Sequence, residues 1–133
     1  MAELSVEDLE LFRASNFAHV STLLEDGSPH AIVVWVDEQD GRVRFNSAER
    51  SVKVKNLRRD PRVAVSVHGQ EDPYRAVTVL GTATLTTDGA DEHADQLTRK
   101  YTDMDRYPDE WRAPGEVRIK IEVRAESILR YGY

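Results

Sequence analysis

Residues 45–67 read FNSAERSVKVKNLRRDPRVAVSV, and the residue pattern changes twice within this stretch. Strand-like alternation stops near Ser47, bases and isolated valines follow, and alternation resumes after Asp60-Pro61. The residue before a proline disfavours helical backbone, so a helix that begins after Ser47 must end at Asp60. The stretch therefore predicts a strand, a helix over residues 48–60 and a second strand over residues 62–68.

Most of the remaining chain has the pattern of strands joined by short turns. Further strands are expected over residues 17–24, 29–36, 42–47, 74–86 and 117–124, with 126–131 as an extension of the last. Helices are expected over 5–15, where Ser5 and Asp8 have the spacing of a capping box, and over 88–102. Turns are expected at 25–28, 37–41 and 69–73, and a loop over 103–116. Six strands with helices only at the crossings predict a mainly β fold, a small closed or split antiparallel barrel.

Two strands carry special signals. The centre of 29–36 is continuously apolar, which predicts burial on both faces, in a barrel wall or a dimer interface. Gly81 interrupts the strand over 74–86, which predicts a bulge or a close approach of another backbone.

The charge is unevenly distributed along the chain. The 133 residues have a net charge of −6, yet residues 50–62 hold six bases and one acid, so this segment carries +5 and the other 120 residues carry −11. The acidic total argues against general nucleic-acid binding, and the local basic segment favours a small anionic ligand or an anionic patch on a partner. The length fits one domain over residues 1–133.

Several classes of site and location are excluded by what the sequence lacks. Without cysteine there is no disulfide, thiolate-bound metal or thiol nucleophile. The acidic start has no leader pattern and the apolar run 31–36 is too short to span a bilayer, so we expect a cytoplasmic protein without a membrane partner. The four histidines lack metal-site spacing, and neither a nucleophile elbow nor a glycine-rich phosphate loop is present. The acids of 37–40 and 103–110 are expected to be solvated.

The basic helix carries the main functional signal. Asn46 and Ser47 end a strand, and Ser51 and Lys53 follow near the expected helix start. Free backbone N–H groups, hydroxyls and an ammonium suit a phosphate, although a solvated basic helix face has the same pattern. Six aromatic residues could stack on a flat ring or pack in a core or an interface: Trp35, Tyr74, Tyr107, Trp111, Tyr131 and Tyr133.

Three motifs together resemble the pyridoxamine-5′-phosphate-oxidase-like flavin-binding superfamily. They are TLLEDGSPH at 22–30, FNSAERSVKVKNLRRDPR at 45–62 and VLGTATL at 79–85. Over residues 5–130 the chain is most similar to the branch of oxidoreductases that use the deazaflavin coenzyme F420. The resemblance implies a six-stranded split β-barrel, a homodimer with cofactor sites at the subunit interface, and hydride transfer to a small unsaturated or conjugated substrate.

The resemblance also implies roles for individual positions. The phosphate would be held by Asn46, Ser47, Arg50, Ser51 and Lys53. Lys53 matches the family's phosphate lysine, whereas many relatives have arginine where this chain has Ser51, and Arg50 would compensate. The ring face would be lined by His30, Val33, Val34 and Trp35, and bordered by Tyr74, Arg75 and Ala76 from the same or the partner subunit. Lys55, Arg58 and Arg59 would attract the coenzyme's polyglutamate tail or simply face solvent.

Two other functions fit the same resemblance. One is an FMN-dependent oxidase or reductase of the pyridoxamine-phosphate-oxidase type, and the other is a non-catalytic flavin-binding or carrier protein. No side chain is identified as catalytic, because in such enzymes the cofactor carries the hydride and the protein supplies binding and orientation.

Overall fold

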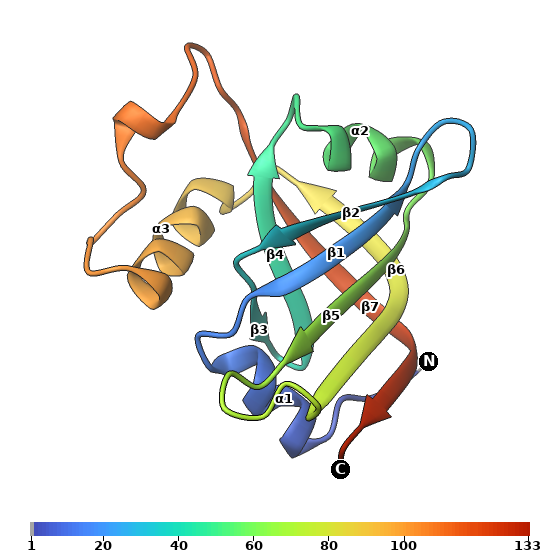
Figure 1. Ribbon diagram of the computed structural model, residues 1–133. Helices are drawn as coiled ribbons and strands as arrows, with labels where there is room; N and C mark the ends of the chain where they lie inside the picture. Colours follow the sequence, from blue (N-terminus) through green and yellow to red (C-terminus); the bar gives the residue numbers. More distant parts are fainter. Residues whose placement is uncertain (1) are drawn as a thin grey trace.

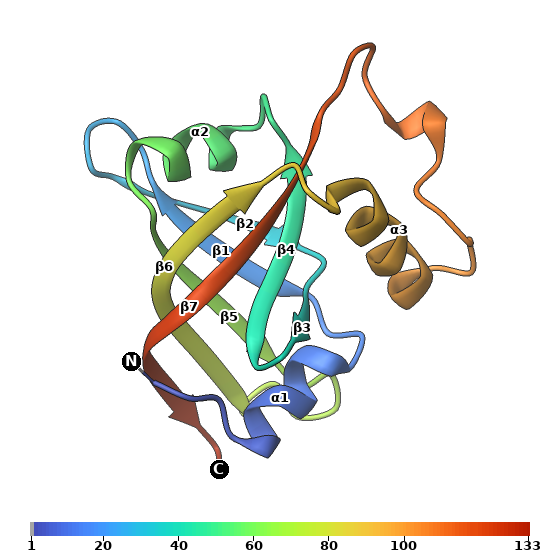
Figure 2. The same ribbon diagram turned by 180° about the vertical axis from the view of Figure 1, so that it is seen from behind.

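Seven strands form one antiparallel sheet that curls into a barrel, in the order β2-β1-β5-β6-β7-β4-β3 (Figures 1 and 2). The computed structural model describes residues 2–133. The strands are β1 (Ala18–Leu23), β2 (Pro29–Val34), β3 (Asp37–Gln39), β4 (Arg42–Ala48), β5 (Arg62–His68), β6 (Ala76–Thr86) and β7 (Arg118–Tyr131). The mainly β split-barrel prediction is confirmed, with one strand more than expected.

The split in the barrel lies between β2 and β4. β2 pairs with β1 and β3 pairs with β4, although β2 and β3 are separated only by Trp35 and Val36. One bent segment therefore forms both edges of the sheet. Among the described residues β2 and β4 share no ladder, so side chains from both strands face a gap.

The additional strand corrects the expected turn over 37–41. Asp37 pairs with Arg44 in the β3–β4 ladder, and its carboxylate accepts hydrogen bonds from that guanidinium at 2.8 and 2.9 Å. Its neighbour Glu38 accepts from Arg13 at 2.6 Å and its side chain is only 8% exposed. The prediction that these two acids are solvated was wrong, because their arginine partners come from another strand and from a helix. The turn itself is confined to the residues around Gly41, at φ 80°.

Alternate residues of the strands form the core of the barrel. Val20, Phe45, Val65, Val79 and Ile121 are fully buried, as expected when every second side chain of a curved sheet points inward. Two helices close the ends of the barrel with apolar side chains (Figure 1). They are α1 (Val6–Arg13), which contributes Leu11 and Phe12, and α2 (Val52–Arg59), which contributes Val54 and Leu57.

The helices begin and end close to their predicted positions, except for the start of α2. The capping box of α1 is present, with Asp8 N–H donating to Ser5 Oγ at 3.2 Å and Ser5 N–H donating to the Asp8 carboxylate at 2.8 Å. α2 starts at Val52 and not at residue 48, because β4 continues to Ala48 and Ser51 is the N-cap. The third helix, α3 (Ala90–Tyr101), packs beside β4 and β7. Within residues 2–133 no helix combines the length and apolar character needed to cross a membrane.

Gly81 lies at a bulge, as predicted. The β6–β7 register shifts between Leu80 and Gly81. A Cβ atom at Gly81 would lie 2.1 Å from the carbonyl oxygen of Arg124. Both expected features, the bulge and the close approach, are therefore confirmed.

β2 is exposed in the single chain. Ile32 and Val33 are 41% and 53% exposed, and only Val34 of this strand is buried. Burial on both faces in a barrel wall was wrong, because β2 is an edge strand at the split. The alternative, an interface with a second copy, stays a prediction.

Candidate functional site

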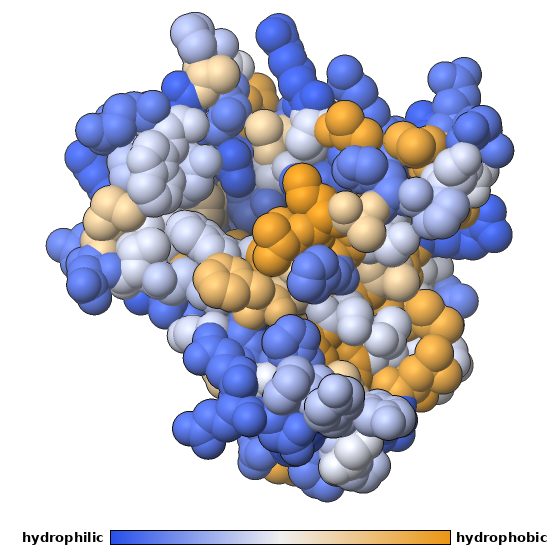
Figure 3. Space-filling model, in the orientation of Figure 1, coloured by the Kyte–Doolittle hydropathy of each residue, from blue (hydrophilic) through white to orange (hydrophobic). Residues whose placement is uncertain are grey.

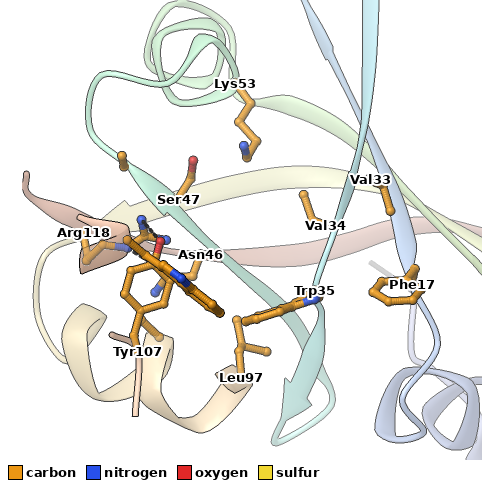
Figure 4. A pocket seen from close by; sticks show the side chains of 13 residues that line it. Phe17, Val33, Val34, Trp35, Asn46, Ser47, Lys53, Leu97, Tyr107 and Arg118 are labelled. Carbon is orange, nitrogen blue, oxygen red and sulfur yellow. Dashed lines mark hydrogen bonds between the residues drawn. The ribbon is translucent and has the colours of Figure 1, made fainter. Parts of the chain in front are cut away.

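A cavity of about 480 Å³ lies at the split, in the size range of small-molecule sites. Its walls come from β2, β4, the first turn of α2, α3 and the loop over 103–116 (Figure 4). Six of the predicted site residues line it: Val33, Val34, Trp35, Asn46, Ser47 and Lys53. The structure thus brings together the expected ring-lining and phosphate-binding positions.

Lys53 brings a positive charge to one end of the cavity. Its side chain extends from α2 into the space between β2 and β4 (Figure 4). Burial, together with the nearby charge of Arg118, lowers the pKa of the Lys53 ammonium. No carboxylate among the described residues forms an ion pair with it. Two cations that repel each other in a partly buried site are stabilised by a bound anion.

Arg118 is the second cation at this end, and the sequence analysis missed it. The guanidinium donates from Nε to Asn46 Oδ1 at 2.9 Å and from Nη1 to Glu116 at 3.1 Å, and its side chain is 10% exposed. It also stacks on the Tyr107 ring, with its central carbon 4.7 Å from the ring centroid. Arg118 opens an alternating strand that carries bases at several positions, so nothing in its local sequence distinguishes it. Only its ladder pairing with Ala48 places it beside the phosphate-site residues.

The two serines of the predicted phosphate site have different positions. Ser51 caps α2, accepting from Val54 N–H at 3.3 Å, and it does not line the cavity. Ser47 lines the cavity and donates to Ser51 Oγ at 2.8 Å. Ser47 is therefore the hydroxyl that a ligand in this cavity can reach, and Ser51 supports it.

Aromatic side chains form the other end of the cavity. Trp35 stacks on Tyr101, with ring centroids 5.4 Å apart and planes 4° apart. Tyr101 is held by donation to the carbonyl oxygen of Asn16 at 2.6 Å, and burial raises its pKa to about 12, so it stays neutral. Trp111 and Tyr107, from the loop, contact each other edge to face at 5.6 Å and connect this end with Arg118, because Trp111 lies beside Trp35 and Tyr107 lies under the guanidinium. These flat surfaces suit a planar ligand.

Besides Arg118, four cavity residues were not predicted from the sequence: Phe17, Ala48, Ala94 and Leu97. The two alanines and Leu97 present small or aliphatic side chains at helical spacing or at a strand end. Such side chains are typical of any core, so the sequence holds no signal for their place in a site. Tyr107 and Trp111 were noted only as possible stacking residues.

The other predicted site residues lie outside the cavity of the single chain. His30 lies across from Thr22 in the β1–β2 ladder, with its Nδ1 buried and without a hydrogen-bond partner. Arg50 lines a neighbouring hollow with Glu49 and Glu116. Residues 74–76 lie near the C-terminus, where Tyr74 contacts Tyr131 and Arg75 stacks on Tyr133 at 5.0 Å. Their binding roles remain predictions.

The remaining bases of the basic segment are mostly engaged within the chain. Arg58 pairs with Glu49 at 2.8 Å and Arg62 pairs with Asp60 at 2.7 Å. Arg59 donates to the carbonyl oxygen of Leu23 at 2.8 Å. Arg58, Arg59 and Arg62 are therefore engaged within the chain, and Lys53 is the base of this segment that lines the cavity.

Comparisons with known proteins agree with this architecture. A sequence profile of the pyridoxamine 5′-phosphate oxidase family matches residues 5–129. An F420 reductase structure is 24% identical with a TM-score of 0.79, covering 90% of this chain and 94% of that chain. A conserved hypothetical protein from Mycobacterium tuberculosis is 21% identical with a TM-score of 0.77, covering 98% and 86%. An FAD-binding protein from Mesorhizobium loti is 24% identical with a TM-score of 0.67, covering 96% and 92%.

At these identities the structural neighbours establish the shared fold. A search of curated proteins finds no significant match. The family profile spans nearly the whole chain, from the capping box of α1 to the end of β7. This protein belongs to the pyridoxamine 5′-phosphate oxidase family, a family of flavin-binding proteins that includes oxidoreductases.

Proposed function

We propose that this protein is an oxidoreductase that transfers a hydride between coenzyme F420 and a small unsaturated or conjugated organic substrate. The observation that carries the proposal is one cavity with two cations, Lys53 and Arg118, at one end and a flat aromatic wall at Trp35 at the other. A cofactor with a planar ring and a phosphate-bearing side chain matches both ends. The structural neighbour named F420 reductase supports the deazaflavin among such cofactors.

The donor set of the cavity fits such a cofactor. Lys53, Ser47 and Arg118 would bind the phosphate with charged and neutral hydrogen bonds. Val33, Val34 and Trp35 would lie along the ring. When bound, the cofactor supplies the two-electron hydride chemistry, and the chain's residues bind it, orient it and exclude water.

An FMN-dependent reaction is the second candidate, and a non-catalytic flavin carrier is the third. FMN also joins a planar ring to a phosphate, so it matches the same two ends of the cavity. The FAD-binding structural neighbour favours a flavin over a deazaflavin. A carrier protein would bind the flavin in the same cavity and would differ from the enzyme only in transferring no hydride to a substrate.

Spectral titration of the purified protein separates these candidates. We expect coenzyme F420 to bind with micromolar affinity or better, and its absorption and fluorescence to change on binding. FMN should bind more weakly. Reduced F420 should then be oxidised by the protein in the presence of an enone or quinone acceptor. Tight FMN binding without F420 binding would replace the leading proposal by the FMN enzyme. F420 binding without turnover of any acceptor would favour the carrier.

A second copy of the chain is proposed to cover the open side of the cavity. Two cross-strand rows on the outer face of the sheet contain no charged residue. The rows are Val33–His19–Ser66–Thr78–Leu129 and Ala31–Ser21–Ala64–Leu80–Ser127. Figure 3 shows apolar residues gathered in the middle of this side of the molecule. Val33 belongs both to this face and to the cavity, so a partner packed here would also complete the site.

Light scattering tests the dimer. We expect the protein at micromolar concentration to have twice its 15.1 kDa chain mass. Leu80→Lys places a charge within the neutral face and should give monomers, because an unpaired charge is costly to bury in an interface. Val6→Lys, at an exposed position on α1, is the matched control and should stay dimeric. A monomeric wild type would contradict the shared site.

A further inference from the structure

A chain of buried and half-buried polar groups begins at Arg118 and Asn46, which line the cavity, and continues to His93 and Asp37, which do not. Arg118 Nε donates to Asn46 Oδ1 at 2.9 Å, and Asn46 Nδ2 lies 3.2 Å from His93 Nδ1. His93 Nε2 in turn lies 3.1 Å from Asp37 Oδ1. His93 is 1% exposed and does not line the cavity. The four residues come from β7, β4, α3 and β3, so the chain of contacts exists only in the folded barrel.

The partners of Asn46 determine which way its amide points. Arg118 Nε can only donate, so the amide oxygen must face it. The carbonyl oxygen of Ala90 can only accept, so Asn46 Nδ2 must face it, at 2.9 Å. The second N–H of that nitrogen then points to His93 Nδ1, which must be the unprotonated, accepting nitrogen.

Asp37 selects the same tautomer from the other end. Burial would raise the pKa of this carboxyl, but hydrogen bonds from His93 and Arg44 lower it below its ordinary value, so it is a carboxylate that only accepts. His93 Nε2 must therefore carry the proton. Both neighbours thus require the Nε2–H tautomer, and the donors and acceptors agree along the whole chain of contacts.

We propose that His93 is a positioning residue that, through Asn46, holds the Arg118 guanidinium in place for the phosphate of the ligand. The inference rests on the proposed phosphate site. Arg118 is oriented at Nε by the neutral Asn46 amide and at Nη1 by the Glu116 carboxylate, while the charge of Asp37 is balanced by Arg44. The Asn46 contact therefore fixes the direction of the guanidinium without adding a second negative charge beside it, as a carboxylate at position 46 would. Without the His93 acceptor, the second N–H of Asn46 Nδ2 has no partner, and Ala90 and Arg118 alone hold the amide.

The role of His93 can be tested by how strongly the protein prefers a phosphorylated ligand over the same ligand without its phosphate. The quantity is the ratio of dissociation constants for riboflavin and FMN, and in parallel for the deazaflavin chromophore without its phosphate side chain and F420. At metal sites, removal of a group that orients a ligand residue typically costs about 10- to 100-fold in affinity, and we take the lower end for an arginine that is also held by Glu116 and Tyr107. We therefore expect His93→Leu to lower this ratio about tenfold. His93→Gln, whose amide can accept from Asn46 and donate to Asp37, should largely restore it.

The matched control is Thr98→Val, which removes another buried polar group of α3. The Thr98 hydroxyl donates only to the carbonyl oxygen of Ala94 in its own helix, at 2.8 Å. We expect this variant to keep the wild-type ratio even if its stability falls. Equal losses in the Thr98 and His93 variants would show a general effect of helix stability and overturn the positioning role.

A measurement on the wild type keeps the inference testable if His93→Leu does not fold. Nitrogen NMR of the imidazole should show a protonated Nε2 and an unprotonated Nδ1 near neutral pH. The opposite tautomer would refute the chain of hydrogen bonds from Asp37 through His93 and Asn46 to Arg118. A wild type that does not prefer the phosphorylated ligand would refute the phosphate site, and the inference with it. If the wild type prefers the phosphorylated ligand and His93→Leu keeps that preference, the positioning role of His93 is refuted and the phosphate site is not.

Discussion

Gly81→Ala is expected to lower the free energy of unfolding by about 3 kcal/mol or more, as severe overpacking does. The added Cβ would lie 2.1 Å from the carbonyl oxygen of Arg124 and 2.9 Å from its carbonyl carbon. Both are backbone atoms of β7, so no side chain can rotate away to make room. The β6–β7 ladder would have to separate at the bulge, and this ladder joins the two longest strands of the barrel.

Gly27→Ala is the matched control for chemical denaturation. Gly27 has a φ of 87°, and a Cβ there would have no neighbour within 4 Å. Its substitution should cost only the conformational strain of a left-handed residue, about 1 kcal/mol. If both variants lose the same small amount of stability, the close approach at Gly81 is not what shapes the bulge.

Lys53→Ala is expected to weaken binding of F420 or FMN about tenfold to a hundredfold, or about 1.5–3 kcal/mol. The lost group is a partly buried ammonium that faces the cavity beside Arg118 and has no carboxylate partner among residues 2–133. Its hydrogen bond to a phosphate would be charge-assisted and shielded from water, which makes it stronger than a surface contact. Isothermal calorimetry of the phosphorylated ligand measures the loss directly.

Lys55→Ala provides the control, because Lys55 is an exposed base of the same helix that does not line the cavity. Lys55→Ala should hardly change the affinity for FMN. The affinity for F420 should fall only modestly, because the variant loses an exposed positive charge that attracts the glutamate tail of the coenzyme. Riboflavin should bind Lys53→Ala and the wild type alike. An unchanged FMN and F420 affinity in Lys53→Ala would refute the phosphate assignment.

Local patterns in the sequence were sufficient to predict most of the secondary structure. Alternation, apolar runs and β-forming residues between turn signals predicted six of the seven strands, Asp60-Pro61 predicted the end of α2, and Ser5 with Asp8 predicted the capping box. These signals work because strands, caps and proline effects depend on residues within a few positions of one another. The third strand was missed because Asp37–Gln39 has the composition of a turn and is held in the sheet by Arg44.

The sequence predicted two walls of the candidate site, residues 33–35 and the strand-to-helix segment. The strand-to-helix segment around Ser47 and Lys53 concentrates its chemistry in a few consecutive residues, and the structure places both at the cavity. Arg118 and the loop aromatics could not be assigned, because their place depends on how distant strands pair. The ladder that sets Ala48 opposite Arg118 decides that a second cation stands at the same end of the cavity.

The sequence alone determined a mainly β barrel with a basic strand-to-helix crossing that carries Lys53. The tertiary structure decided where that lysine points, which arginine stands beside it, and that His93 and Asp37 form a buried support behind the site. The physical reason is that hydrophobic alternation specifies which face of each strand is buried, whereas the pairing register specifies which side chains meet across strands. That register is a property of the whole closed sheet, and no single segment of the chain contains it.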